Sequence, residues 1–93
     1  MRVLVVEDEV PLATALAEGL RGEGHSVDVA SDGGEGLWFT EENDYDVIVL
    51  DLMLPVMDGF EVCRRLRSAR NWTPVLMLTA RDADPDMVDG LDA

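Results

Sequence analysis

VIVLDLMLPVMDG, residues 47–59, is the stretch of sequence that decides the fold of this chain. Its first four residues, Val47–Leu50, form an unbroken apolar and mostly β-branched run, which is typical of a strand covered on both faces of a parallel sheet. Asp51 follows that run directly, and Pro55 and the pair Asp58-Gly59 favour a loop. The stretch therefore predicts a buried strand that ends at an acidic residue and leads into a loop.

Three further apolar segments predict strands of the same kind, at Arg2–Val6, Ser26–Ala30 and Val75–Leu78. Apolar residues at helical spacing separate them, with Asp32 as an N-cap of the second helix. Strands that alternate with helices favour a parallel sheet with helices on both faces, a doubly wound α/β fold. The helices are expected at residues 12–20, 33–40 and 60–66, with a further helical turn or two from Pro85. Helical spacing places Phe60, Cys63 and Leu66 on one face of the third helix, and the side chain of Met53 is expected to pack in the core.

Length and composition indicate one small domain. The chain has 93 residues, 47% of them hydrophobic, which is enough for one packed core. Its apolar runs are far shorter than the roughly 20 residues of a membrane span. The N-terminus turns acidic after Val6 and is not typical of a secretory signal. A lone cysteine, Cys63, excludes an internal disulfide framework and favours a reducing, cytoplasmic location.

The charge of the chain is strongly negative. Twenty acidic residues against seven basic ones give a formal net charge of −13. Such a surface repels phosphate backbones, so direct binding of nucleic acid by this segment is not expected. All seven basic residues are arginines, and the chain contains no lysine.

Acidic residues follow two of the predicted strands. Glu7 and Asp8 come after the first strand, Asp51 after the third, and the hydroxyl residue Thr79 after the fourth. In doubly wound sheets, ligands bind beyond the carboxyl ends of the strands, so these residues predict a site. Carboxylates about 4 Å apart repel by about 4 kcal/mol at an effective dielectric near 20, which a hard cation such as Mg²⁺ relieves. An aspartate beside such a cation is also a possible phosphoryl acceptor.

Three motifs in this order carry a resemblance to a known family. They are Val5-Val6-Glu7-Asp8-Glu9, then Leu50–Pro55 with Met57-Asp58-Gly59, then Leu78-Thr79-Ala80-Arg81. The chain resembles the receiver domains of two-component response regulators, from Arg2 to its last residue. It is similar to the OmpR/PhoB-type regulators, which carry a winged-helix DNA-binding domain. The resemblance implies a flavodoxin-like, CheY-like receiver fold and a sensor histidine kinase as the phosphoryl donor.

The resemblance also implies roles for matching positions. Asp51 is similar to the phosphoacceptor, and Glu7 and Asp8 to the acidic pair that binds Mg²⁺. The backbone carbonyl of Met53 matches a further metal ligand, and Thr79 matches the switch hydroxyl that bonds to the phosphoryl group. A module with these roles accepts a phosphoryl group without being a turnover enzyme.

The C-terminal end departs from the family pattern. Receiver domains normally continue with a fifth strand, a lysine that pairs with the phosphoryl group, a switch aromatic and a fifth helix. Here the sequence stops at Ala93, so residues 1–93 are expected to form a receiver domain that lacks its last strand and helix. An unpaired edge on the fourth strand, with apolar side chains exposed around Val75–Leu78, then predicts self-association through the C-terminal half. The alternative function is a truncated docking or oligomerisation fragment that does not switch.

Two other classes and one structural explanation compete with this interpretation. A haloacid-dehalogenase-type phosphatase usually has a second aspartate two residues after the nucleophile, where this chain has Met53. A flavodoxin-like flavin binder needs a phosphate loop after the first strand, where Glu7-Asp8-Glu9 would repel phosphate. The acids could instead serve a helix N-terminus or a loop cap, and the arginines of Arg64–Arg70 could be a solvated helix face.

Overall fold

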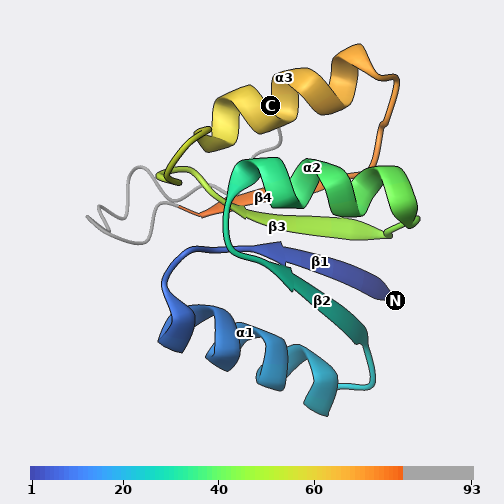
Figure 1. Cartoon of the computed structure of the whole chain (residues 1–93). Coiled ribbons are helices and arrows are strands. Elements are labelled where there is room, and N and C mark those ends of the chain that lie inside the picture. Colours follow the sequence, from blue (N-terminus) through green and yellow to red (C-terminus); the bar gives the residue numbers. More distant parts are fainter. Residues whose placement is uncertain (79–93) are drawn as a thin grey trace.

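The structure, a computed structural model, describes residues 1–78, in which four strands alternate with three helices (Figure 1). Thr79 and the helical turn expected from Pro85 lie outside the described residues. The predicted strands are confirmed, with the third extending to include Asp51. The elements are β1 Arg2–Val6, α1 Val10–Gly22, β2 Ser26–Ala30, α2 Gly33–Glu42, β3 Val47–Asp51, α3 Gly59–Ser68 and β4 Val75–Leu78.

The strands form one parallel sheet in the order β2-β1-β3-β4. From β1 the chain goes to β2 on one side, and then returns to place β3 on the other side. The direction of strand addition therefore reverses between β1 and β3, which are neighbours in the middle of the sheet. This arrangement is the doubly wound topology that the alternation of strands and helices predicts.

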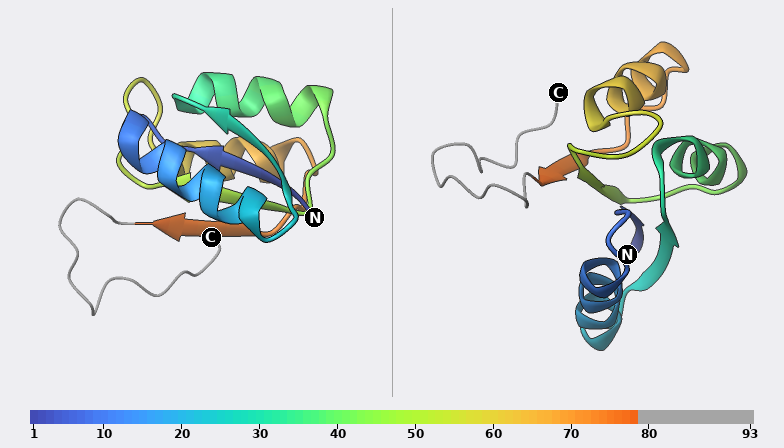
Figure 2. Two further views of the ribbon diagram at one scale, coloured as in Figure 1. Left: turned by 90° about the horizontal axis from the view of Figure 1, so that it is seen from below. Right: turned by 60° about the vertical axis from the view of Figure 1, so that its left-hand side comes forward.

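Helices cover both faces of the sheet, α1 on one face and α2 with α3 on the other (Figures 1 and 2). Because side chains alternate along a strand, each central strand contributes to two cores. On β1, for example, Leu4 and Val6 face α2 and α3, whereas Val3 and Val5 face α1. The core on the α2 and α3 side contains the buried residues Leu4, Val6, Ala30, Tyr45, Ile48, Leu50, Leu54, Val62, Cys63, Leu66, Val75 and Met77. The core on the α1 side contains Val3, Val5, Ala17, Val27 and Val49.

An aspartate caps the N-terminus of each of the two helices α2 and α3. The side chain of Asp32 accepts a hydrogen bond from the backbone N–H of Glu35 at 2.7 Å, which confirms the predicted N-cap of α2. The side chain of Asp58 accepts one from the N–H of Glu61 at 2.9 Å and caps α3. These bonds satisfy amide groups that the first turn of a helix leaves unpaired. The cap on α3 fixes where the loop after β3 ends.

Three sequence-based expectations about exposure need correction. Phe60 was expected to share the buried face of α3, but its side chain is 60% exposed, because Gly59 and Val62 occupy the buried positions beside Cys63 and Leu66. Met53 was expected to pack in the core and is 51% exposed. The apolar residues of β4 are mostly covered, since Val75 and Met77 are buried and Leu76 alone among the four is clearly exposed. None of the helices in residues 1–78 has both the length and the apolar character that crossing a membrane requires.

Candidate metal and phosphoacceptor site

The acidic residues lie at the carboxyl ends of the two central strands. Asp51 is the last residue of β3, and Glu7 and Asp8 directly follow β1. The pairing of Val6 with Leu50 places the residues after them side by side. This edge of the sheet is also where the strand order reverses, which is the usual position of a ligand site in such folds. The register of β1 against β3 thus assembles the predicted acidic site.

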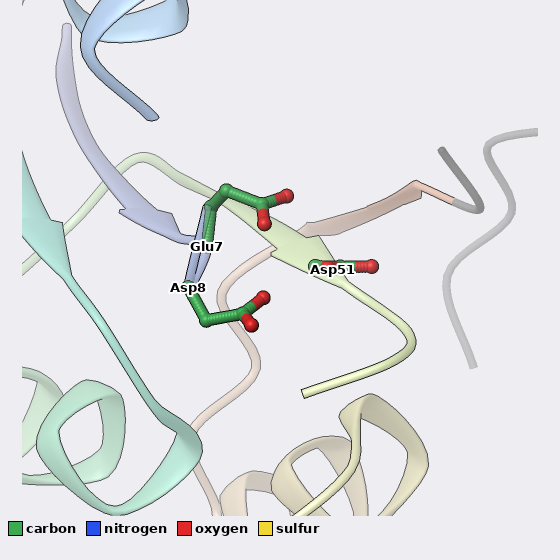
Figure 3. Close-up of side chains that lie close together, drawn as sticks. All are labelled: Glu7, Asp8 and Asp51. Atoms are coloured by element: carbon green, nitrogen blue, oxygen red, sulfur yellow. The ribbon is translucent and has the colours of Figure 1, made fainter. Parts of the chain in front are cut away.

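The carboxylates of Glu7, Asp8 and Asp51 form one cluster. One carboxylate oxygen from each residue lies within 4.8 Å of the others. Figure 3 shows the three side chains converging on the space between the end of β1 and the end of β3. Glu7 and Asp51 are only 2% and 1% exposed, whereas Asp8 is partly exposed. Two buried carboxylates and one at the surface therefore share a site that solvent reaches from the Asp8 side.

Backbone amide groups from the following loops hold two of these carboxylates in place. The N–H of Glu9 donates a hydrogen bond to Oε2 of Glu7 at 3.0 Å. The N–H of Met53 donates one to Oδ1 of Asp51, also at 3.0 Å. In both cases the donating N–H belongs to the second residue after the acid. The loop that follows each strand therefore orients the carboxylate at the end of that strand. Such bonds favour the charged form of a carboxylate.

The pKa of Glu7 shows how strongly the cluster resists negative charge. This pKa is raised from 4.5 to about 7, mainly by burial and to a lesser extent by the charge of Asp51 and by hydrogen bonds with Asp8 and Asp51. The hydrogen bond from Glu9 acts in the opposite direction without cancelling it. A site that raises the pKa of an acid this far favours uptake of positive charge, as a proton or as a cation.

The donor set of this cluster fits Mg²⁺. Magnesium takes oxygen ligands, retains several waters and is usually held by one or two carboxylates, which Asp8 and Asp51 can supply. Glu7 adds a third carboxylate within the same 4.8 Å. The N–H of Met53 donates a hydrogen bond to Asp51, so the backbone of Met53 lies beside the cluster. The carbonyl of Met53, which the resemblance implies as a further ligand, is part of this same residue. The sequence predicted the three carboxylates at this edge, and the structure brings them together.

The structure adds features beside the cluster that the sequence analysis did not identify as part of the site. An open hollow of about 610 Å³ adjoins it, lined by Asp8, by Asp58 and by residues of the loop after β3. Gly59 lies directly against the end of β3, because a Cβ on it would be 2.8 Å from the carbonyl oxygen of Asp51. In the sequence, the Asp58-Gly59 pair is a turn signal and part of the second family motif. Its second role depends on packing between α3 and the end of β3, which one local motif does not reveal.

Comparison with known proteins agrees with this geometry. The family model for the response regulator receiver domain matches residues 3–93. The transcriptional regulatory protein TcrA of Mycobacterium tuberculosis is 55% identical over 92 residues, covering 99% of this chain and 36% of TcrA. This chain therefore spans little more than a third of that relative's length.

Solved structures show the same fold. The Francisella response regulator 1452 receiver domain matches with a TM-score of 0.84 and 36% identity, over 96% of this chain and 74% of that one. The response regulator TrrA of Thermotoga maritima matches with a TM-score of 0.81 and 34% identity, over 87% of this chain and 70% of that one. The TrrA structure is a complex with Mg²⁺ and BeF. The CheY-like receiver fold predicted from the motifs is thereby confirmed.

Proposed function

Since this chain belongs to the family of response regulator receiver domains, we propose that Asp51 accepts a phosphoryl group from a sensor histidine kinase in a Mg²⁺-dependent reaction. The observation that carries the proposal is the buried carboxylate of Asp51 within 4.8 Å of two further carboxylates, at the strand-order reversal. Thr79 is proposed as the switch hydroxyl, on the resemblance of its motif alone, because it lies outside the described residues.

The chemistry assigned to Asp51 is a phosphoryl transfer. A carboxylate oxygen of Asp51 forms a bond to phosphorus, while the phosphorus–nitrogen bond of a phosphoimidazole donor breaks and its electron pair stays on the imidazole nitrogen. The N–H of Met53 binds Oδ1 of Asp51 at 3.0 Å and thereby fixes the orientation of the carboxylate. Burial of Asp51 removes competing water from around its oxygens.

Glu7, Asp8 and Asp51, with the backbone carbonyl of Met53, are the residues proposed to hold Mg²⁺. A bound Mg²⁺ supplies positive charge that offsets the charge on the transferring phosphoryl oxygens. Glu7 is assigned a place in the cluster through a bound water. It is buried, unlike Asp8, and its raised pKa suits a carboxylate whose charge needs a cation beside it. The structure of TrrA, a structural relative, is a complex with Mg²⁺ and BeF, which supports this assignment by similarity.

The proposed module is a signalling domain and not a turnover enzyme. Met53 occupies the position where haloacid-dehalogenase-type hydrolases have a general acid, and it offers no titratable group. TcrA is a transcriptional regulatory protein, so an output domain that controls transcription is proposed for the longer parent protein, acting in the cytoplasm. The segment itself, with a net charge of −13, is not proposed to contact nucleic acid.

Self-association through the C-terminal half remains a prediction. Among the described residues, β4 pairs with β3 on one edge, and its exposed residue Leu76 is apolar. Edge strands can pair with another chain, which favours association. Light scattering over a concentration series tests this, and a monomer at every concentration would contradict it.

Intact-mass measurement of the chain with acetyl phosphate tests the proposed function. In the presence of Mg²⁺, one phosphoryl group is expected per chain; with EDTA in place of Mg²⁺, labelling is expected to fall to background. The variant Asp51→Asn is expected to block labelling. Asp44→Asn is a matched control, because Asp44 is an exposed acid just before β3, at the other end of the acceptor strand. Equal labelling of the two variants would contradict the assignment of Asp51.

A further inference from the structure

The loop between β3 and α3 contains a strained turn at Val56. Its φ is 70°, a backbone conformation that L residues rarely adopt and that is least favourable for β-branched ones. The N–H of Met57 donates a hydrogen bond to the carbonyl oxygen of Pro55 at 2.7 Å. A hydrogen bond that encloses a single residue with positive φ defines the strained form of the γ-turn. Two separate observations, the dihedral angle and the hydrogen bond, thus identify the same turn.

Packing of the Val56 side chain does not account for this conformation. The side chain is 91% exposed, so it gains almost no burial from its position. A residue that is both strained and exposed is held by its neighbours, and strain of this kind is concentrated at functional sites. The role of the turn must therefore be sought in the backbone of the loop.

Both ends of this loop are fixed. The N–H of Gly59 donates a hydrogen bond to the carbonyl oxygen of Leu52 at 2.9 Å, which ties the two ends of the loop together. A Cβ on Gly33 would lie 2.7 Å from the carbonyl oxygen of Met57, so the first residue of α2 packs directly on the loop backbone. Leu54 is buried in the core. With these points fixed, the residues between Leu54 and Met57 can close only through a sharp turn.

The same loop provides the backbone that serves the acidic cluster. Met53 lies three residues before Val56, and its N–H binds Oδ1 of Asp51 at 3.0 Å. The hollow beside the cluster is lined by Asp8 together with Leu52, Met53, Leu54 and Pro55. A change in the turn at Val56 would therefore move backbone groups that border the cation site.

We infer that Val56 is a positioning residue for the cation site: closure of its strained turn places the Met53 backbone beside Asp51, and the strain limits how often the turn is closed. This inference depends on the proposed function, since it assumes that the acidic cluster binds Mg²⁺. The apparent dissociation constant of a site equals its intrinsic value divided by the fraction of molecules in the competent conformation. A residue that is unstrained at this φ raises that fraction and tightens binding.

Variants at position 56 test the inference, with binding of MgCl₂ to the chain measured by calorimetry. Glycine adopts positive φ without steric cost, so Val56→Gly is expected to tighten Mg²⁺ binding by about threefold to tenfold. Val56→Ala removes the same exposed side chain but keeps a Cβ, and it is expected to remain closer to the original affinity. Proline cannot adopt positive φ, so Val56→Pro is expected to weaken binding. Equal affinity in the glycine and alanine variants would overturn the inference.

Hydrogen exchange of the Met57 amide, measured without Mg²⁺, provides a second readout. After correction for intrinsic rates, exchange is expected to be slower in Val56→Gly than in the original chain, because the turn is closed more of the time. Equal exchange rates would mean that the turn is already closed, which overturns the inference. Slower exchange with unchanged Mg²⁺ affinity would also overturn it. If no variant binds Mg²⁺, the cation site itself fails, and the exchange rates still show whether Val56 controls the turn.

Discussion

Replacing Asp51 with asparagine is expected to stabilise the folded chain when Mg²⁺ is absent. Oxygens of Asp51, Glu7 and Asp8 lie within 4.8 Å of one another, and two charges at that distance repel by about 3.5 kcal/mol at an effective dielectric near 20. The increase in the pKa of Glu7 from 4.5 to about 7 corresponds to about 3 kcal/mol at 1.36 kcal/mol per unit. Burial contributes the largest part of that increase, and Asp51→Asn leaves Glu7 buried. A gain of about 1–2 kcal/mol in the free energy of unfolding is therefore expected at pH 8.

The effect of Asp51→Asn has a defined pH dependence. Between about pH 4.5 and pH 7, Glu7 keeps its proton in the folded state and loses it in the unfolded state. The folded state then binds more protons, so stability falls as the pH rises through this window. In Asp51→Asn the pKa of Glu7 is expected to be less raised, which makes this fall smaller. The gain in stability is thus expected to be larger at pH 8 than at pH 5.

Urea unfolding in EDTA, followed by circular dichroism at pH 5 and pH 8, measures these differences. An asparagine Oδ1 can still accept the hydrogen bond that Met53 donates to Oδ1 of Asp51, so the local geometry is preserved. Asp44→Asn is the control, since it removes the same charge at an exposed position. If Asp51→Asn is less stable than the original chain, or gains no more than Asp44→Asn, repulsion in the acidic cluster is not the dominant effect and the reasoning is wrong.

Three further predictions concern the metal site and the packing around it. Asp8→Asn is expected to abolish Mg²⁺ binding in calorimetry while the chain stays folded, and unchanged affinity would exclude Asp8 as a ligand. Gly59→Ala is expected to destabilise the chain in urea unfolding, because the new Cβ would lie 2.8 Å from a backbone oxygen. Gly19→Ala is expected to stabilise α1 by about 0.5–1 kcal/mol, because the space around Gly19 is open and alanine favours a helix more than glycine does. Similar effects of the two substitutions would refute the close-contact argument. Tyr45→Phe removes the hydrogen bond that the tyrosine hydroxyl donates to Asp28 at 2.6 Å and is expected to cost about 1 kcal/mol of stability, so an unchanged unfolding midpoint would contradict it.

The sequence predicted the four strands and the order of the elements because its signals there are local. The apolar, β-branched run Val47–Leu50 favours a strand covered on both faces, and the N-cap at Asp32 depends on residues within one helical turn. The carboxylate cluster was also predictable, because residues that follow parallel strands meet at one edge of the sheet. Glu7 and Asp51 are far apart in the sequence, and their proximity was predicted from the parallel sheet topology. That topology was itself predicted from the alternation of strands and helices.

Other features depend on tertiary packing and could not be predicted in this way. Helical spacing alone placed Phe60 on the buried face of α3, but the close packing of Gly59 against Asp51 turns α3 so that Phe60 is exposed. The strained turn at Val56 follows from fixed points at both ends of its loop, and valine carries no sequence signal for positive φ. Deep burial of Glu7 likewise requires knowledge of which elements cover the end of β1.

The central claim is that Asp51 is the residue that receives the phosphoryl group, and reductive mapping tests it most directly. The chain is incubated with acetyl phosphate and Mg²⁺, and borohydride then reduces the aspartyl phosphate to homoserine, which marks the acceptor permanently. Peptide mass mapping is expected to find homoserine at position 51, and only when both acetyl phosphate and Mg²⁺ were present. Homoserine at Asp8 or Asp58, or a stable phosphate on Ser68 with position 51 unmodified, would contradict the account.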